Sequence, residues 1–241
     1  MAYHCTLTRA ISKRYPSSQA YGSQGFRKVT KLKSQVVLAI LRMGYDVTWT
    51  DTDIAWLKNP IPLMAAMQSD FVVQSNAPST EADANGPLRI NSGFYRVRSS
   101  RQTVAAMEQI VLHAAASTLT EQPSFYMVLC GGKEGKFKKG DSQCLYPGPD
   151  GKSQNDRTPP LLVDYLSRDL YPAGAYKSLW DDEGIRHNTE LVILHNNWIS
   201  GMKNKIQRLI DRRLWYYNRE KLICSYDPDP TFVLDWAIEA D

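Results

Sequence analysis

Apolar residues first repeat with helical spacing over residues 31–42, where positions 32, 36, 37, 40 and 41 are hydrophobic. Positions three and four apart share one face of a helix, so this segment is predicted to be an amphipathic helix. Gly44 follows as a helix terminator. The β-branched and aromatic residues at 46–50 then predict a short strand that leads into Asp51.

Further along the chain, apolar segments alternate with turn residues and predict more helices and strands. Strands are expected over residues 71–74, 91–98 and 191–195, the second of them opening with an Asn/Gly turn. Helices are expected over 102–118 and 201–215, with a helical turn at 64–67 and either a helix or a strand at 161–166. Irregular segments are expected over 1–28 and 75–89, and a long surface loop or a hairpin over 130–160. This alternation is typical of a mixed α/β sheet fold.

Asp51 and Asp53 lie at the end of the strand predicted over residues 46–50. Side chains two positions apart in a strand point to the same face, so both carboxylates are expected to face one point beyond the strand end. Ligands of open α/β sheets bind there. Two close carboxylates repel unless a cation relieves them, and Mg²⁺ or Mn²⁺ keeps open positions for phosphate groups. The pair predicts a metal-bridged phosphate site, with a solvated turn as the alternative.

Composition sets the broad class. The chain has 241 residues, 43% of them hydrophobic and 22% charged, which suits one α/β domain or two small ones with a substantial core. A formal net charge of +4, from 29 basic and 25 acidic residues, is too small to predict nucleic acid as the main partner. No apolar stretch approaches the roughly 20 residues that cross a membrane, and no signal peptide is visible.

The four cysteines form no CxxC or zinc-binding pattern. Cys130 and Cys144 flank a loop rich in glycine and lysine, so they could form a disulfide in an oxidising compartment. Two separate thiols are the simpler expectation.

Four segments in order resemble the motifs of the plant-type nucleotide-diphospho-sugar transferases, glycosyltransferase family 77. They are residues 44–60 (GYDVTWTDTDIAWLKNP), 91–95 (NSGFY), 121–125 (EQPSF) and 195–201 (HNNWISG), the last followed by Lys205. The order and rough spacing fit from about residue 20 to about residue 218. The resemblance implies the GT-A glycosyltransferase fold, with a mixed, mostly parallel sheet flanked by helices.

The resemblance also implies a metal centre of Asp51, Asp53 and His195 that holds Mn²⁺ or Mg²⁺. Asp53 is then the direct ligand, and Asp51 contacts the ribose or a metal-bound water. Without the motifs, His195 reads as a buried imidazole at a strand end. Lys205 would place its ammonium on the departing phosphate, although a solvated helix face is an equal alternative, and Gly201 belongs to the same donor-binding segment.

Four more positions are implied around the donor sugar. Asn91 would hydrogen-bond it, and Gly93 would give it room because a Cβ would obstruct its approach. Glu121 and Gln122 would lie beneath the sugar ring as catalytic residues, with Glu121 standing where the family usually has Asp.

The implied reaction transfers a sugar from a UDP-sugar, with a pentose or galactose expected, to a glycan or glycoprotein acceptor. The family builds cell-wall polysaccharides and arabinans, and its members retain the anomeric configuration. Phosphate-assisted front-face attack and a double displacement through Glu121 both remain open. Trp198 is the best candidate to stack on a sugar, whereas Trp49 and Trp56 are expected in the core.

The chain also departs from the family. Family members usually carry a membrane anchor that places them in the Golgi lumen, and a strand-helix-strand unit that holds the nucleotide base. Neither is visible ahead of Asp51, so we expect a domain over residues 29–220 that lacks part of its nucleotide-binding unit, between an irregular segment (1–28) and a tail (221–241). The alternative function is a catalytically impaired remnant that binds a glycan or a partner transferase. A basic binding module over residues 203–221 is weaker, because its apolar positions predict docking onto the core.

Overall fold

Helix α2 (Gln24–Arg42) is the first element of the computed structural model, which describes residues 21–76, 89–131, 143–146, 161–182, 185–215, 217–218 and 223–224. The helix begins seven residues before its predicted start, inside the segment that was expected to be irregular. The reason is Ser23, whose hydroxyl accepts a hydrogen bond from the backbone amide of Phe26 at 3.1 Å and caps the first turn. Residues 1–20 of the segment expected to be irregular, and residues 225–241 of the predicted tail, lie outside the described residues.

The main sheet has five strands in the spatial order β1-β4-β3-β6-β5. In chain order these are β1 (Val47–Thr50), β3 (Phe71–Ser75), β4 (Ile90–Val97), β5 (Gln143–Leu145) and β6 (Leu162–Tyr165). The segment at 161–166 is therefore a strand. The predicted turn at residues 91–93 is wrong, because these residues already lie in β4, where Asn91 pairs with Gln74 of β3.

The sheet is mixed, as expected, but the expectation that it is mostly parallel is wrong. Only β3 and β6 pair in parallel, while β4 runs antiparallel to both of its neighbours, β1 and β3. Strand β4 separates β1 from β3, which share a direction, and the edge strand β5 also runs antiparallel to its neighbour β6. Local periodicity cannot reveal this, because a strand has the same alternation in either direction.

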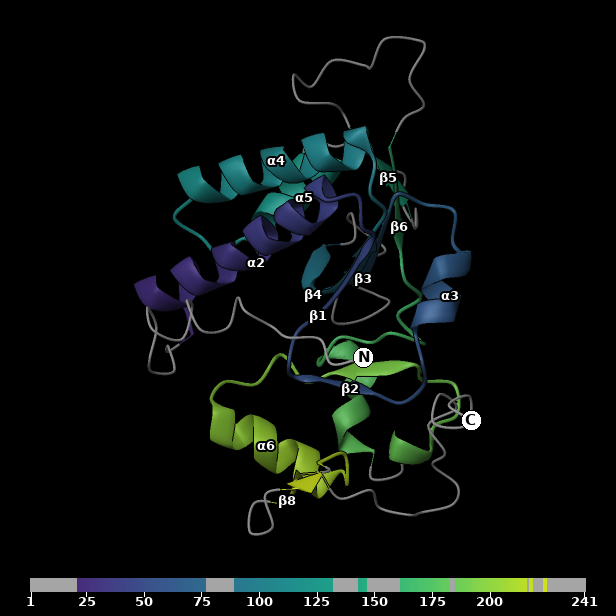
Figure 1. Cartoon of the computed structure of the whole chain (residues 1–241). Helices are drawn as coiled ribbons and strands as arrows, with labels where there is room; N and C mark the ends of the chain where they lie inside the picture. The colour runs from purple at the N-terminus through teal and green to yellow at the C-terminus, as the bar shows by residue number, and fades with distance from the viewer. Residues whose placement is uncertain are drawn as a thin grey trace.

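Three helices cover one face of this sheet, namely α2, α4 (Arg101–Ala116) and α5 (Gln122–Cys130) (Figure 1). α4 begins with a capping box in which Ser100 and Thr103 satisfy each other's backbone amides. The largest core cluster lies between these helices and the sheet, and Tyr95, Phe71 and Val97 are buried in it. The short helix α3 (Ile61–Ala66) lies beyond the opposite face.

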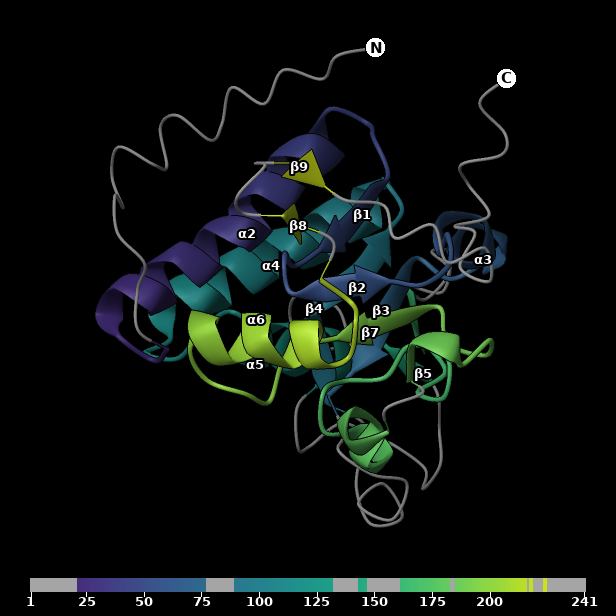
Figure 2. The ribbon, with the colours of Figure 1, turned by 90° about the horizontal axis from the view of Figure 1, so that it is seen from below.

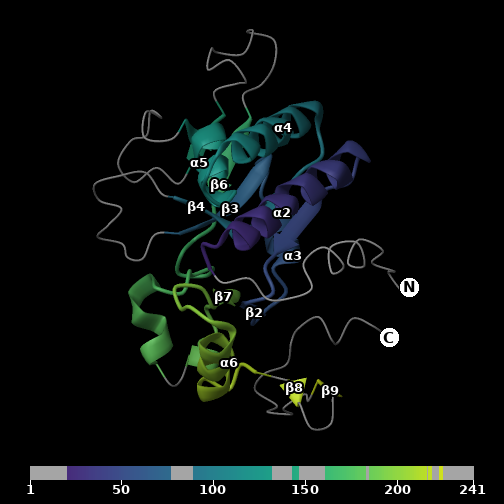
Figure 3. The same cartoon turned by 90° about the vertical axis from the view of Figure 1, so that its left-hand side faces the viewer.

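A second layer lies below the main sheet in Figure 1. Strands β2 (Ile54–Trp56) and β7 (Ile193–His195) form an antiparallel pair there, which Figure 2 shows from below. Helix α6 (Met202–Asp211) lies at the same end of the molecule, away from α4 (Figure 3). The other elements of this region are the 3-10 helices η3 (Tyr176–Asp181) and η4 (Ile185–His187) and the strand pair β8 (Tyr217–Asn218) and β9 (Ile223–Cys224).

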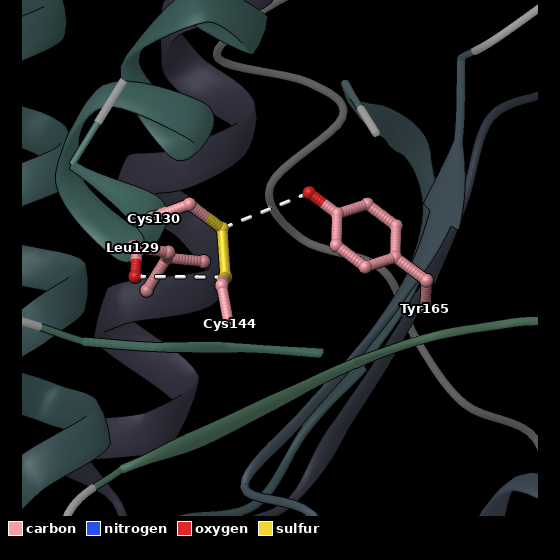
Figure 4. Close-up of a disulfide and its surroundings, with 4 residues drawn as sticks. All are labelled: Leu129, Cys130, Cys144 and Tyr165. Atoms are coloured by element: carbon pink, nitrogen blue, oxygen red, sulfur yellow. Dashed lines mark hydrogen bonds between the residues drawn. A yellow bond between two sulfur atoms is a disulfide. The ribbon is translucent and has the colours of Figure 1, made fainter. Parts of the chain in front are cut away.

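Cys130 and Cys144 form a disulfide, so the expectation of two separate thiols is wrong (Figure 4). The bond joins the C-terminal end of α5 to the edge strand β5, and the two Cα atoms are 5.4 Å apart. Both residues are buried, and the Cys130 sulfur lies 3.7 Å from the hydroxyl of Tyr165. Among the described residues, no helix combines the length and apolar character that a membrane span requires.

Candidate metal centre

Asp51, Asp53 and His195 converge at the junction of the two layers. One ligand atom from each residue can be chosen so that all three lie within 4.8 Å of one another. The two aspartates follow β1 in a turn rather than within the strand, so they converge through the turn and not through strand alternation. Antiparallel pairing of Ile54 with His195 fixes the histidine beside them, and the backbone amide of Asn196 donates to the carbonyl of Asp53 at 2.8 Å.

Gly93 makes this convergence possible. A Cβ atom at this position would lie 2.4 Å from Cε1 of His195, 2.9 Å from Oδ1 of Asn91 and 3.1 Å from Oδ2 of Asp51. The first distance is far below any normal carbon contact, and His195 is buried, so it has little room to move. The space that a Cβ would take at this glycine is therefore filled by the protein's own side chains.

Lys33 of helix α2 forms an ion pair with Asp51. The sequence motifs did not identify it as a site residue. Its Nζ lies 2.8 Å from Oδ1 of Asp51 and 3.2 Å from Oε1 of Glu121, and its side chain is 17% exposed. Burial would lower the pKa of this ammonium, but the charges of Glu121 and Asp51 outweigh burial and raise the pKa above its ordinary value. Its spacing in the sequence indicates a buried position, because Lys33 lies four residues before Val37 and eight before Leu41, on the buried face of the helix.

Glu121 and Gln122 meet strand β4 at the start of helix α5. Glu121 is 2% exposed, and its Oε1 accepts a hydrogen bond from the hydroxyl of Ser92 at 3.0 Å. The side-chain oxygen of Gln122 accepts from the backbone amide of Ser92 at 3.3 Å. Both side chains therefore hold Ser92 of β4 in place next to Gly93.

Asn91 is buried, and its side chain bonds to the protein itself. Its Oδ1 accepts from the backbone amide of Gly93 at 2.8 Å, and its Nδ2 donates to Oδ1 of Asn76 at 3.1 Å. The indole Nε1 of Trp198 donates to the same Asn76 oxygen at 3.3 Å. Trp198 is 56% exposed and has a left-handed backbone with φ of 57°, which is uncommon outside glycine.

Lys205 reaches Asp53 from helix α6, so it does not belong to a free solvated face. The buried Asn196 fixes this helix: its Nδ2 donates to the carbonyl of Lys205 at 2.9 Å, and its Oδ1 accepts from Nε of Arg208 at 2.7 Å. The guanidinium of Arg208 in turn lies 4.1 Å from the ring centroid of Trp180. The helix starts at Gly201, whose φ of 87° a residue with a side chain would adopt only with strain.

Asp53 is held in its ionised form. Burial would raise the pKa of this carboxyl, but hydrogen bonds and charges from His195 and Lys205 outweigh burial and keep the pKa well below its usual range. Arg208 is a further cation close to Asp53. Burial lowers the pKa of its guanidinium to about 10, and the charge of Asp53 partly opposes this shift. The centre therefore carries a permanent carboxylate beside an imidazole, which is a ligand pair for a divalent metal.

Comparison with known proteins identifies the family of this chain. The sequence profile of the nucleotide-diphospho-sugar transferases matches residues 2–209. The chain belongs to this family. It is 43% identical over 208 residues to the beta-arabinofuranosyltransferase RAY1 of Arabidopsis thaliana, and this match covers 85% of the chain and 37% of the relative.

Two other transferases match at lower identity. A UDP-galactose:fucoside alpha-3-galactosyltransferase of Dictyostelium discoideum is 29% identical, with 86% of the chain and 31% of the relative covered. A UDP-D-xylose:L-fucose alpha-1,3-D-xylosyltransferase of Arabidopsis thaliana (number 3) is 25% identical, with 83% of the chain and 50% of the relative covered. The chain thus spans from about a third to half of these relatives' length. No solved structure matches the chain significantly.

The residues of this family member fit a hard divalent cation. The donor set is two carboxylates and one imidazole, which suits Mn²⁺ or Mg²⁺ better than a thiolate-seeking metal. The two aspartates differ in their partners. Both oxygens of Asp51 are engaged by Lys33, and one of them also accepts from the indole of Trp49 at 2.9 Å. Asp53 instead faces Lys205 and the imidazole of His195.

Proposed function

We propose that this chain is the metal-dependent donor-binding part of a glycosyltransferase that uses a UDP-sugar. The observation that carries the proposal is the meeting of Asp53, His195 and Lys205 at one point, where two ligands and one cation face each other. A diphosphate leaving group needs this combination, because its charge must be neutralised as the glycosidic bond breaks.

The relatives support the donor and the class of sugar. They are named for arabinofuranose, galactose and xylose, and two of the names give a UDP-sugar as the donor. A pentose or galactose is therefore the transferred group, and a glycan or glycoprotein is the acceptor. Trp198 offers its exposed indole face to a sugar ring, because its N–H is already held by Asn76.

Within the site, Asp53 and His195 would hold Mn²⁺ or Mg²⁺. When bound, the ion supplies positive charge to the diphosphate oxygens. Asp51 stays with Lys33, which supports a role in orienting the donor rather than direct ligation. With an ion on Asp53, Lys205 would give up this contact and its ammonium would serve the diphosphate, a movement that its flexible four-carbon side chain allows.

The position of Glu121 bears on how the configuration is retained. A nucleophile for double displacement must reach the anomeric carbon, but Glu121 is almost completely buried and is bonded to Lys33 and Ser92. This favours front-face attack assisted by the departing phosphate. Glu121 and Gln122 then act through strand β4, by keeping Ser92 and Gly93 in place.

One observation favours the alternative, a catalytically impaired remnant that binds a glycan. Both aspartates already have a protein cation, because Lys33 is bound to Asp51 and Lys205 to Asp53. In a remnant these lysines would replace the metal permanently. The two functions differ in what happens at Lys205, since only in the transferase does it compete with the ion.

Calorimetric titration of the Lys205→Met variant separates them. In the transferase, loss of the competing ammonium strengthens binding of Mn²⁺ alone and weakens binding of UDP in the presence of Mn²⁺. The control is Lys203→Met, an exposed lysine on the same helix, which should change neither. Asp53→Asn should abolish the binding of both. Mn²⁺ affinity that is absent in the wild type, or that Lys205→Met leaves unchanged, would favour the remnant.

We place the protein in the Golgi lumen, where the nucleotide-sugar transferases of cell-wall synthesis work. The disulfide between Cys130 and Cys144 supports an oxidising compartment of this kind. Fractionation of cells that express a tagged copy, followed by thiol labelling with and without reductant, tests both statements. A cytosolic protein with two reactive thiols would contradict them.

A further inference from the structure

Gln74 is a fully buried amide in strand β3 that no motif in the sequence singles out. Strands β3 and β4 shift register at this point: Val73 lies opposite Tyr95, whereas the next residue, Gln74, lies opposite Asn91. Irregularities of this kind re-aim the neighbouring side chain and are common next to active sites. Here the side chain of Gln74 reaches His195, 121 positions away in the sequence.

The side-chain amide of Gln74 has only one possible orientation. Its Nε2 lies 3.0 Å from the carbonyl oxygen of Tyr171 and 3.1 Å from that of Pro172, and carbonyl oxygens only accept hydrogen bonds. The amide NH₂ group must face these two oxygens, so Oε1 faces Nδ1 of His195 at 2.8 Å. The carbonyl of Pro172 also accepts from the backbone amide of His195 at 3.3 Å, and thus holds both residues together.

This orientation fixes the tautomer of His195. Because the Gln74 oxygen can only accept, Nδ1 must donate and therefore carries the hydrogen. In the neutral imidazole, Nε2 then presents a lone pair, and it lies 3.4 Å from Oδ1 of Asp53. In this neutral form the two acceptors face each other and attract a cation between them. In the imidazolium form a proton on Nε2 fills that place, which is how the charge of His195 lowers the pKa of Asp53.

We propose that Gln74 is the positioning residue of the metal centre, which holds His195 as the Nδ1–H tautomer and aims Nε2 at the ion bound by Asp53. Outer partners of this kind orient imidazole ligands and raise their affinity for metals. The metal part of this inference rests on the proposed function. The tautomer part does not, and it can be measured without a metal.

The test is the variant Gln74→Met, which keeps the length of the side chain and removes both halves of the amide. Long-range proton–nitrogen NMR at about pH 9, where imidazoles are neutral, reads the tautomer of each histidine. The chain has four histidines, and His195→Gln identifies the signal of His195. We expect Nδ1–H in the wild type and a shift toward Nε2–H in Gln74→Met.

Mn²⁺ affinity is measured on the same proteins by calorimetry, and we expect it to fall about 10- to 100-fold in Gln74→Met. Ser124→Ala is the matched control, because Ser124 is equally buried and bonds Nδ1 of a different histidine, His113, at 3.0 Å. The control should lose stability but keep both the His195 tautomer and the Mn²⁺ affinity.

The outcomes separate the two parts. An Nε2–H tautomer of His195 in the wild type, or an unchanged tautomer in Gln74→Met, overturns the positioning role. A tautomer that follows Gln74 in a protein that binds no Mn²⁺ upholds the role of Gln74 toward His195 and overturns the proposed metal centre. If Gln74 had only a structural role, Gln74→Met would lower the stability of the fold and leave the His195 tautomer and the Mn²⁺ affinity unchanged.

Discussion

Replacement of Lys33 by methionine should destabilise the fold, because it leaves a buried carboxylate without its cation. Lys33 lies 3.2 Å from Glu121, which is 2% exposed, and 2.8 Å from Asp51. Removal of one partner of a buried ion pair costs about 3–5 kcal/mol. Lys33 is partly exposed and methionine preserves the packing of its apolar stem, so we expect a loss of about 2–3 kcal/mol, at or below the low end of that range.

The assay is urea unfolding followed by tryptophan fluorescence, with the free energy taken from linear extrapolation. Arg42→Met is the matched control on the same helix, because Arg42 pairs with Glu108 at 2.8 Å but both side chains are largely exposed. Exposed pairs contribute about 0–1 kcal/mol, so the control should change little.

A double-mutant cycle identifies the cause. Glu121→Gln removes the charge and keeps the shape, so in the Lys33→Met background it should cost less than in the wild type, with a coupling of about 1–2 kcal/mol. The reasoning would be refuted if Lys33→Met were no worse than Arg42→Met, or if the effects of the two site substitutions simply added.

Three further predictions follow from the site and the disulfide. Gly93→Ala should lower Mn²⁺ affinity at least about 10-fold, because its Cβ would displace His195; Gly44→Ala, where the structure leaves open space, should pay only backbone strain of about 1–2 kcal/mol and bind Mn²⁺ normally. Because the pKa of Asp53 is lower in the folded than in the unfolded protein, its stabilising contribution is complete above about pH 4 and is lost as the pH falls further. Asp53→Asn should therefore show a weaker loss of stability than the wild type as the pH falls from about 4 to 2, as read by acid unfolding. An equal loss would show that Asp53 is not the group responsible. Serine at both Cys130 and Cys144, which are 14 positions apart, should cost about 3 kcal/mol in thermal or urea unfolding. The wild type treated with reductant should match that double variant, and no change on reduction would contradict the bond.

The sequence predicted the parts of this molecule that depend on local pattern or on recognised motifs. Strands at 47–50, 71–75 and 193–195 and helices at 101–116 and 202–211 agree with the predicted segments apart from their ends. The convergence of Asp51, Asp53 and His195 was also predicted, through the family resemblance. The roles of these residues, and the domain limits at 29 and 220, stay predictions.

Other features depend on pairing between distant segments, which local pattern does not encode. Strand β4 has the alternation of any buried strand, yet its direction makes the sheet mostly antiparallel. Gln74 reads as an ordinary strand residue until the register shift aims it at His195. Lys33 is a partial exception, because a lysine on the buried stripe of a helix predicts a partner even though the partner itself cannot be named.

The disulfide was not predictable from spacing, because the same cysteines would serve equally well as two thiols. Its formation depends on the position of β5 beside the end of α5, which the sequence does not show. The packing around Gly93 was likewise not predictable, because its missing Cβ accommodates His195 of the second layer and Asp51 of the first. Its role toward a donor sugar stays a prediction.

The most direct test of the central claim is electron paramagnetic resonance of Mn²⁺ bound to the full chain with UDP. If Asp53 and His195 hold the ion against the diphosphate, the Mn²⁺ signal should show hyperfine coupling both to an imidazole nitrogen and to phosphorus. The nitrogen coupling should disappear in His195→Gln while the phosphorus coupling of any remaining bound Mn²⁺ persists. Mn²⁺ that couples to phosphorus without any imidazole coupling in the wild type would contradict the account.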